Sequence, residues 1–227
     1  MAQLSAESEL RCWAYRTIAQ LLDEIPERLP PLGAATGQGM IDPEAGQRYS
    51  GTRTAAENLQ RAFAAQTREG IQADQTRLLI NAPGGVLAPP YASWYLDGAL
   101  QGPSCDWVAQ EYGSQALEPD SESGEPADFL ATELEYMYFL CRHERAARLT
   151  ADAAALAAVE QAQARFLNHL SRWLPRFLSR LRAGRPREVY RALADLLEVF
   201  LNEELERVKP TLDASAAGAS GSPSSVG

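Results

Sequence analysis

The chain has 227 residues, of which 45% are hydrophobic, and a formal net charge of −9. This length and composition fit a globular protein with a sizeable core, and the acidic surface repels nucleic acid and anionic membranes while attracting basic peptides. No stretch approaches the roughly 18 apolar residues of a membrane span, and the N-terminal residues lack the pattern of a signal peptide, so we expect a cytoplasmic protein without stable membrane insertion.

Apolar residues recur at helical spacing along most of the chain, and no useful alternating strand pattern interrupts them. In the N-terminal half we expect helices over residues 5–25, 52–69, 74–79 and 104–116. Residues 32–50 are expected to be a loop or to contain helix starts. Pro89 and Pro90 predict an extended or turning stretch that leads into a short helix carrying Trp94.

The C-terminal half is predicted to contain three longer helical regions. Pro126 suits a first helical turn, and behind it an apolar stripe is formed by Leu130, Leu134, Met137 and Cys141. An Ala-rich helix is expected over residues 150–172, with Pro175 kinking or restarting it. The next stripe consists of Phe166, Leu170, Trp173, Phe177 and Leu181, and the last helix places on one face Val189, Leu193, Leu196 and Phe200.

These elements predict an all-α fold, organised as a single globular helical bundle. The domain is expected to span residues 1–210, with the acidic segment near 118–125 as a hinge-like linker. Residues 211–227 are rich in Ala, Ser and Gly and are predicted to be a disordered tail.

Signals of catalysis are negative throughout the chain. Its two histidines, His143 and His169, have no carboxylate, cysteine or second histidine at metal-ligand spacing in the same helical run. Three cysteines without a C-x-x-C pair fit reduced thiols in a cytosol. The nucleophile elbow of hydrolases and the phosphate loop of nucleotide-binding proteins are both absent. We therefore expect no catalytic residues, no metal and no cofactor.

Four carboxylates cluster in the segment 125–139, where no basic residue occurs. If the segment is helical, Asp128, Thr132 and Glu135 share one face, away from the apolar stripe, and we expect Asp128 to be exposed. Carboxylates favour the N-terminus of a helix because of its dipole, so the cluster can be a solvated helix start. Alternatively, it can bind an arginine-containing peptide through charge-assisted hydrogen bonds.

The same segment resembles the TorD/DmsD/NarJ family of chaperones. Residues 125–128 and 133–137 read EPAD and ELEYM and are similar to the family's E-P-x-D-H and E-L-x-F-M signature. Further blocks that resemble the family follow in its order, namely residues 15–22, 87–96, 166–181 and 190–201. The sequence departs from the signature where Phe129 replaces the family's histidine, so no role of that histidine can be carried over.

This resemblance implies a TorD-like, non-enzymatic chaperone. Such proteins bind the catalytic subunit of a molybdopterin oxidoreductase, through its twin-arginine signal peptide or its apo form, until the cofactor is inserted before export. An apolar groove and an acidic rim would then take the leader. The residues that the resemblance assigns to peptide binding are Tyr15, Tyr91, Trp94, Tyr95, Glu125, Pro126, Asp128, Phe129 and Glu135.

Each aromatic residue of this set also has a structural interpretation. Trp94 can equally be buried in the core, and Tyr15 can serve in either way, whereas Trp13 and Trp173 lie on helical stripes that favour the core. Two other classes of function remain open: a structural or adaptor helical protein without leader binding, and a metal-dependent enzyme that uses the carboxylates.

Overall fold

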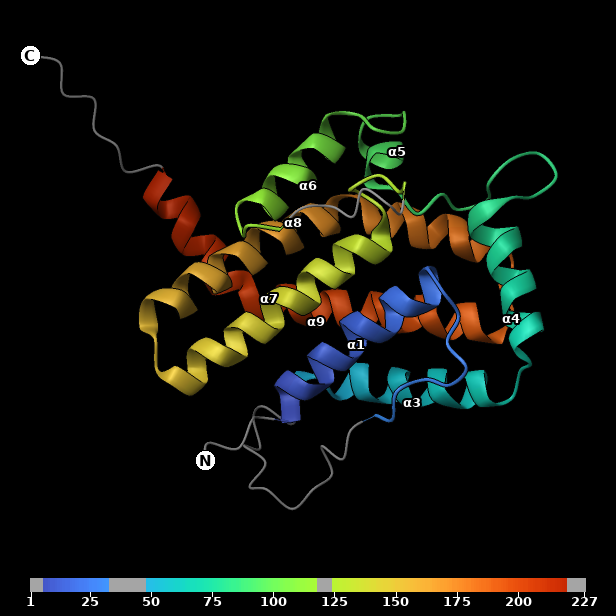
Figure 1. Ribbon diagram of the computed structural model, residues 1–227, viewed down its shortest axis with the longest axis horizontal. Helices are drawn as coiled ribbons and strands as arrows, with labels where there is room; N and C mark the ends of the chain where they lie inside the picture. Colours follow the sequence, from blue (N-terminus) through green and yellow to red (C-terminus); the bar gives the residue numbers. More distant parts are fainter. Residues whose placement is uncertain (1–5, 33–47, 118–123, 220–227) are drawn as a thin grey trace, which may run out of the picture.

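A computed structural model describes residues 6–32, 48–117 and 124–219. These residues form an all-helical bundle without a strand, as predicted, and their one β-bridge joins Tyr91 to Phe129. The helices, drawn in Figure 1, are α1 (Ala6–Leu22), α3 (Ser50–Ala64), α4 (Arg68–Gln75), the π-helix η1 (Thr76–Ile80), α5 (Ala92–Leu96), α6 (Pro103–Gly113), α7 (Leu130–Thr150), α8 (Ala153–Ala183) and α9 (Glu188–Ala219).

The core lies where α7, α8 and α9 pack in sequence, with α1 against α7 and α3 against α9. The predicted apolar stripes face this core: every residue named above for the stripes of the three long helices is buried. Trp13 and Trp173 are also buried, as expected from their positions on helical faces. The helical periodicity of the sequence therefore identified the buried faces correctly.

Pro126 differs from the sequence-based expectation, and two further prolines lie within helices. Pro126 does not begin a helix: it accepts a turn hydrogen bond from Phe129 N (3.0 Å), and the helix starts at Leu130. Pro175 and Pro210 lie inside helices that continue past them. Both are on exposed faces, where water can replace the lost backbone hydrogen bond.

The last helix runs through Ala219, so the first nine residues of the predicted tail are helical. Alanine is the strongest helix former, and it recurs in this stretch. Residues 220–227 and most of the predicted hinge near 118–125 lie outside the described residues.

A short arm made of α5 and α6 lies along α8, at the edge of the bundle opposite α3 (Figure 1). The stretch that contains Pro89 and Pro90 leads into α5 in an extended conformation, as predicted. Among the described residues, no helix is long and apolar enough to cross a membrane.

Candidate functional site

The aromatic loop and the acidic segment lie side by side, although about 35 residues separate them in sequence. Leu130 N donates to Pro90 O (2.8 Å), and Ala92 N donates to Asp128 O (3.1 Å). The Tyr91 and Phe129 rings pack at a centroid separation of 5.5 Å. The start of α7 therefore anchors the loop and the first turn of α5.

Asp128 holds this junction together from inside the protein. Its carboxylate accepts a hydrogen bond from Ser93 N (2.7 Å) at the N-terminus of α5, and the residue is fully buried. A negative charge at a helix N-terminus is favourable, and a charge-assisted bond is stronger than a neutral one. The expectation that Asp128 is exposed on the surface is therefore wrong: the side chain is turned toward the backbone of α5.

The remaining predicted rim residues do not gather around one groove. Glu125 is exposed and accepts a hydrogen bond from the Tyr91 hydroxyl (2.8 Å), beside Pro126. Glu135 lies on the exposed face of α7, where partial shielding of its carboxyl from water, together with the neighbouring Asp23, raises its pKa. Tyr15 is buried in the core, with its hydroxyl 2.5 Å from Glu204. The structure thus unites Tyr91, Phe129 and Glu125 but separates Glu135 and Tyr15 from them.

An open pocket of about 350 Å³ lies between α5 and α8. It is lined by Trp94, Tyr95, Arg176, Ser179 and Arg180. Trp94 is 41% exposed, whereas Tyr95 is buried and stacks on Trp173 at 5.5 Å. Of the predicted apolar groove, Trp94 and Tyr95 line this pocket, and two arginines rather than carboxylates form its other wall.

Close to the junction, Glu133 and His169 form a buried pair. Glu133 Oε1 lies 2.8 Å from His169 Nε2, and both side chains are almost fully removed from solvent. Burial raises the pKa of Glu133 to about 7, although the bond to His169 opposes the shift. The Trp107 ring stacks on His169 at 4.7 Å, and neither member of the pair lines the open pocket.

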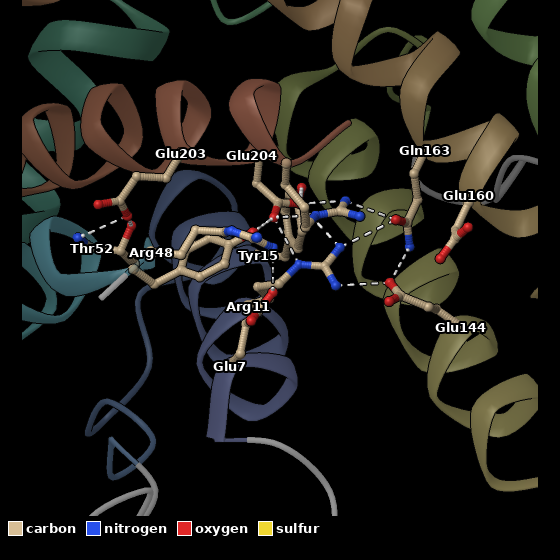
Figure 2. Close-up of polar contacts among 12 residues, drawn as sticks. Glu7, Arg11, Tyr15, Arg48, Thr52, Glu144, Glu160, Gln163, Glu203 and Glu204 are labelled. Atoms are coloured by element: carbon tan, nitrogen blue, oxygen red, sulfur yellow. Dashed lines mark hydrogen bonds and ion pairs between the residues drawn. The ribbon is translucent and has the colours of Figure 1, made fainter. Parts of the chain in front are cut away.

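A second buried polar cluster joins α1, α7, α8 and α9 (Figure 2). Figure 2 shows Arg11 between two carboxylates: Nε donates to Glu204 (2.7 Å), and Nη1 donates to Glu144 (2.8 Å). Its Nη2 also donates to Gln163 (3.2 Å). Arg207 pairs with Glu204 as well (3.0 Å). These contacts satisfy charges that would otherwise be costly to bury.

The arginines set the protonation states of this cluster. They hold the pKa of Glu204 far below its usual range, and they lower the pKa of Glu144 to about 2, in both cases against the effect of burial. Sequence reasoning missed the cluster, but a signal was present: Arg11 is on the same helical stripe as Tyr15 and Ile18, and Glu204 follows Phe200 by four residues.

The described residues contain no group of three or more His, Cys, Asp or Glu side chains that could hold a metal ion. The exposed aromatic side chain and the two arginines of the pocket can contact a partner, whereas the buried carboxylates are turned inward.

Comparison with known proteins gives consistent matches. The family model described as nitrate reductase delta subunit matches residues 46–179. A chaperone protein TorD from Psychrobacter is 29% identical over 225 residues, which covers 93% of this chain and 97% of that protein. Another chaperone protein TorD, from Vibrio cholerae, is 31% identical over 119 residues, covering 52% of this chain and 53% of that protein.

Proposed function

Because the chain belongs to the nitrate reductase delta subunit family, we propose that it is a cytoplasmic chaperone for the catalytic subunit of a molybdopterin oxidoreductase. It would bind the client's twin-arginine signal peptide, its apo form or both, until the cofactor is inserted. The two relatives are named as chaperones, which agrees with the sequence-based expectation that the chain is not an enzyme.

The observation that carries this proposal is the exposed Trp94 on α5, a short helix that backbone and carboxylate hydrogen bonds hold against the start of α7. Tryptophan supplies a large contact area and is enriched among residues that dominate binding energy. Asp128 and Leu130 already hold α5 and the residues before it in place. Binding of a partner therefore does not carry the entropic cost of ordering this segment. The exposed face of the arm is therefore suited to hold an apolar client segment.

The arginines of the leader peptide can contact only those carboxylates that are accessible at the surface of the chain. Asp128 is buried, so it would position the loop and not contact an arginine itself. Glu125 is exposed beside Tyr91, so a guanidinium can reach its carboxylate and form a charge-assisted hydrogen bond. We therefore assign leader contacts to Glu125, Tyr91 and Trp94.

Capture of the tagged chain from its native cell, followed by mass spectrometry, tests the proposal. A molybdopterin oxidoreductase subunit should be enriched with the wild type. Trp94→Ala should weaken its capture by about tenfold, because an exposed aromatic anchor is lost. The matched control is Leu149→Ala, since Leu149 is also exposed but lies at the opposite end of α7. Absence of any such subunit from the wild-type capture contradicts the proposal.

A further inference from the structure

The pocket between α5 and α8 has a charge opposite to the one expected for a site that receives arginines. Arg176 and Arg180 are four residues apart on α8, so they share a face, and both line the pocket. Neither guanidinium forms an ion pair with a carboxylate of the described residues. Two adjacent cations at a concave surface attract an anion, even on a chain whose net charge is −9.

Three carboxylates near the pocket form hydrogen bonds within the arm or at its junction with α7. Asp97 accepts hydrogen bonds from Ser104 N (2.9 Å) and from its hydroxyl (3.0 Å). Glu125 accepts from Tyr91, and Asp128 accepts from Ser93. None of these three carboxylates forms an ion pair with Arg176 or Arg180.

An independent observation comes from Tyr95, which also lines the pocket. The residue is more than nine-tenths buried, and its hydroxyl has no hydrogen-bond partner. Buried hydroxyls are normally paired, so an unpaired one calls for an explanation. Burial raises the pKa of Tyr95, and the positive charges of Arg180 and Arg176 oppose that rise. The hydroxyl and the two guanidinium groups are all donors.

The surroundings of these donors narrow the chemistry of the ligand. Trp94 forms the exposed apolar wall, and Arg180 is partly held in place because its Nε donates to Leu87 O (2.9 Å). A planar guanidinium suits a carboxylate oxygen pair. The combination of donors and an indole favours a carboxylate attached to an apolar neighbour, as in a peptide.

We propose that this pocket binds an Asp or Glu side chain of the client polypeptide, with an adjacent apolar client residue packed on Trp94. The inference rests on the proposed chaperone function and adds a contact that the twin-arginine leader does not supply. The chaperone would then bind both positively and negatively charged groups of the client: the leader's arginines at Glu125, and a client carboxylate at Arg176 and Arg180.

The test uses the subunit captured with the wild-type chain, displayed as overlapping peptides. Labelled wild type should bind peptides in which an acidic residue adjoins an apolar one. Arg176→Gln with Arg180→Gln should weaken that binding by about tenfold or more, as expected for loss of a charge-assisted bond. Arg172→Gln is the matched control: Arg172 is exposed on the same helix, one turn away, and does not line the pocket.

Changes in the peptide keep the test independent of protein stability. Replacing the peptide's acid with its amide should weaken wild-type binding by the same factor, and the arginine substitutions should then have no further effect. Tyr95→Phe, which removes only the hydroxyl, should weaken binding of the acidic peptide severalfold.

Several results would overturn the inference. If the double variant binds every peptide like wild type, or if the amide peptides bind equally well, the pocket does not recognise a carboxylate, although the chaperone function stands. If inorganic phosphate occupies the pocket while binding shows no dependence on acidic residues, the ligand is a small anion. If no subunit is captured at all, the proposed function fails and this inference fails with it.

Discussion

Replacing Arg11 with methionine removes the centre of the buried cluster while keeping much of the side-chain volume. Breaking a buried ion pair costs about 3–5 kcal/mol, because it leaves an uncompensated charge. Here neither carboxylate is left alone: Glu204 keeps Arg207 (3.0 Å), and Glu144 keeps Arg148 (2.9 Å) and Gln163 (3.0 Å). We therefore expect Arg11→Met to lower the free energy of unfolding by about 3 kcal/mol, the lower end of that range. For a domain of this size, that corresponds to a decrease in melting temperature of roughly 6–12 °C.

Urea unfolding followed by circular dichroism measures this loss. The control is Arg182→Met, because Arg182 pairs with Asp195 and Glu198, both exposed, and a surface pair contributes under about 1 kcal/mol. Combining Arg11→Met with Glu204→Gln should cost less than the sum of the two, since they share one interaction. The reasoning is refuted if Arg11→Met unfolds at the same urea concentration as the control, or if the two substitutions are additive.

Four further outcomes follow. Asp128→Asn should lower the free energy of unfolding by about 1–2 kcal/mol, because a charged acceptor at α5 becomes neutral; an unchanged thermal melt would mean that it is no helix cap. Glu133, with a pKa of about 7 against 4.5 when unfolded, contributes stability that is fully present below pH 4.5 and is lost as the pH rises through 7. Glu133→Gln should flatten that decline in urea unfolding at stepped pH, and equal slopes would contradict it. Glu144, whose pKa is lowered to about 2, acts in the opposite sense and loses its contribution as the pH falls from 4.5 to 2. Deleting residues 211–227 should leave the melting temperature unchanged, since Val208 is the last core residue among the side chains whose burial the structure describes; a drop of several degrees would show that the tail docks.

Helix positions and buried faces were predictable because burial repeats with the helical period. Leu130, Leu134, Met137 and Cys141 share one face whatever that face packs against, and all four are buried. The family was predictable for a related reason. Several motif blocks in a fixed order carry more information than any one block, and the family model spans residues 46–179.

The environment of the carboxylates was not predictable, because it depends on what lies opposite them in space. Asp128 was expected to be exposed, yet it meets the backbone of Ser93, 35 residues earlier in the chain. Arg11 and Glu204, 193 residues apart, satisfy each other only once α1 and α9 have packed. A charged residue on an apolar stripe indicates such a partner, but not which residue it is.

The negative net charge of the chain and the local positive charge of the proposed carboxylate site should affect binding kinetics differently. The net charge of −9 repels an acidic client segment at long range, and physiological salt screens charges separated by more than about 8 Å. Arg176 and Arg180 act at contact distance, where screening is weaker. Rising salt should therefore speed association with the acidic peptide, because the repulsion fades, and it should also speed dissociation modestly. Stopped-flow fluorescence resolves the two rates. In the Arg176→Gln, Arg180→Gln variant only the association rate should still respond to salt, and a response of dissociation equal to that of wild type would contradict a local charge pair.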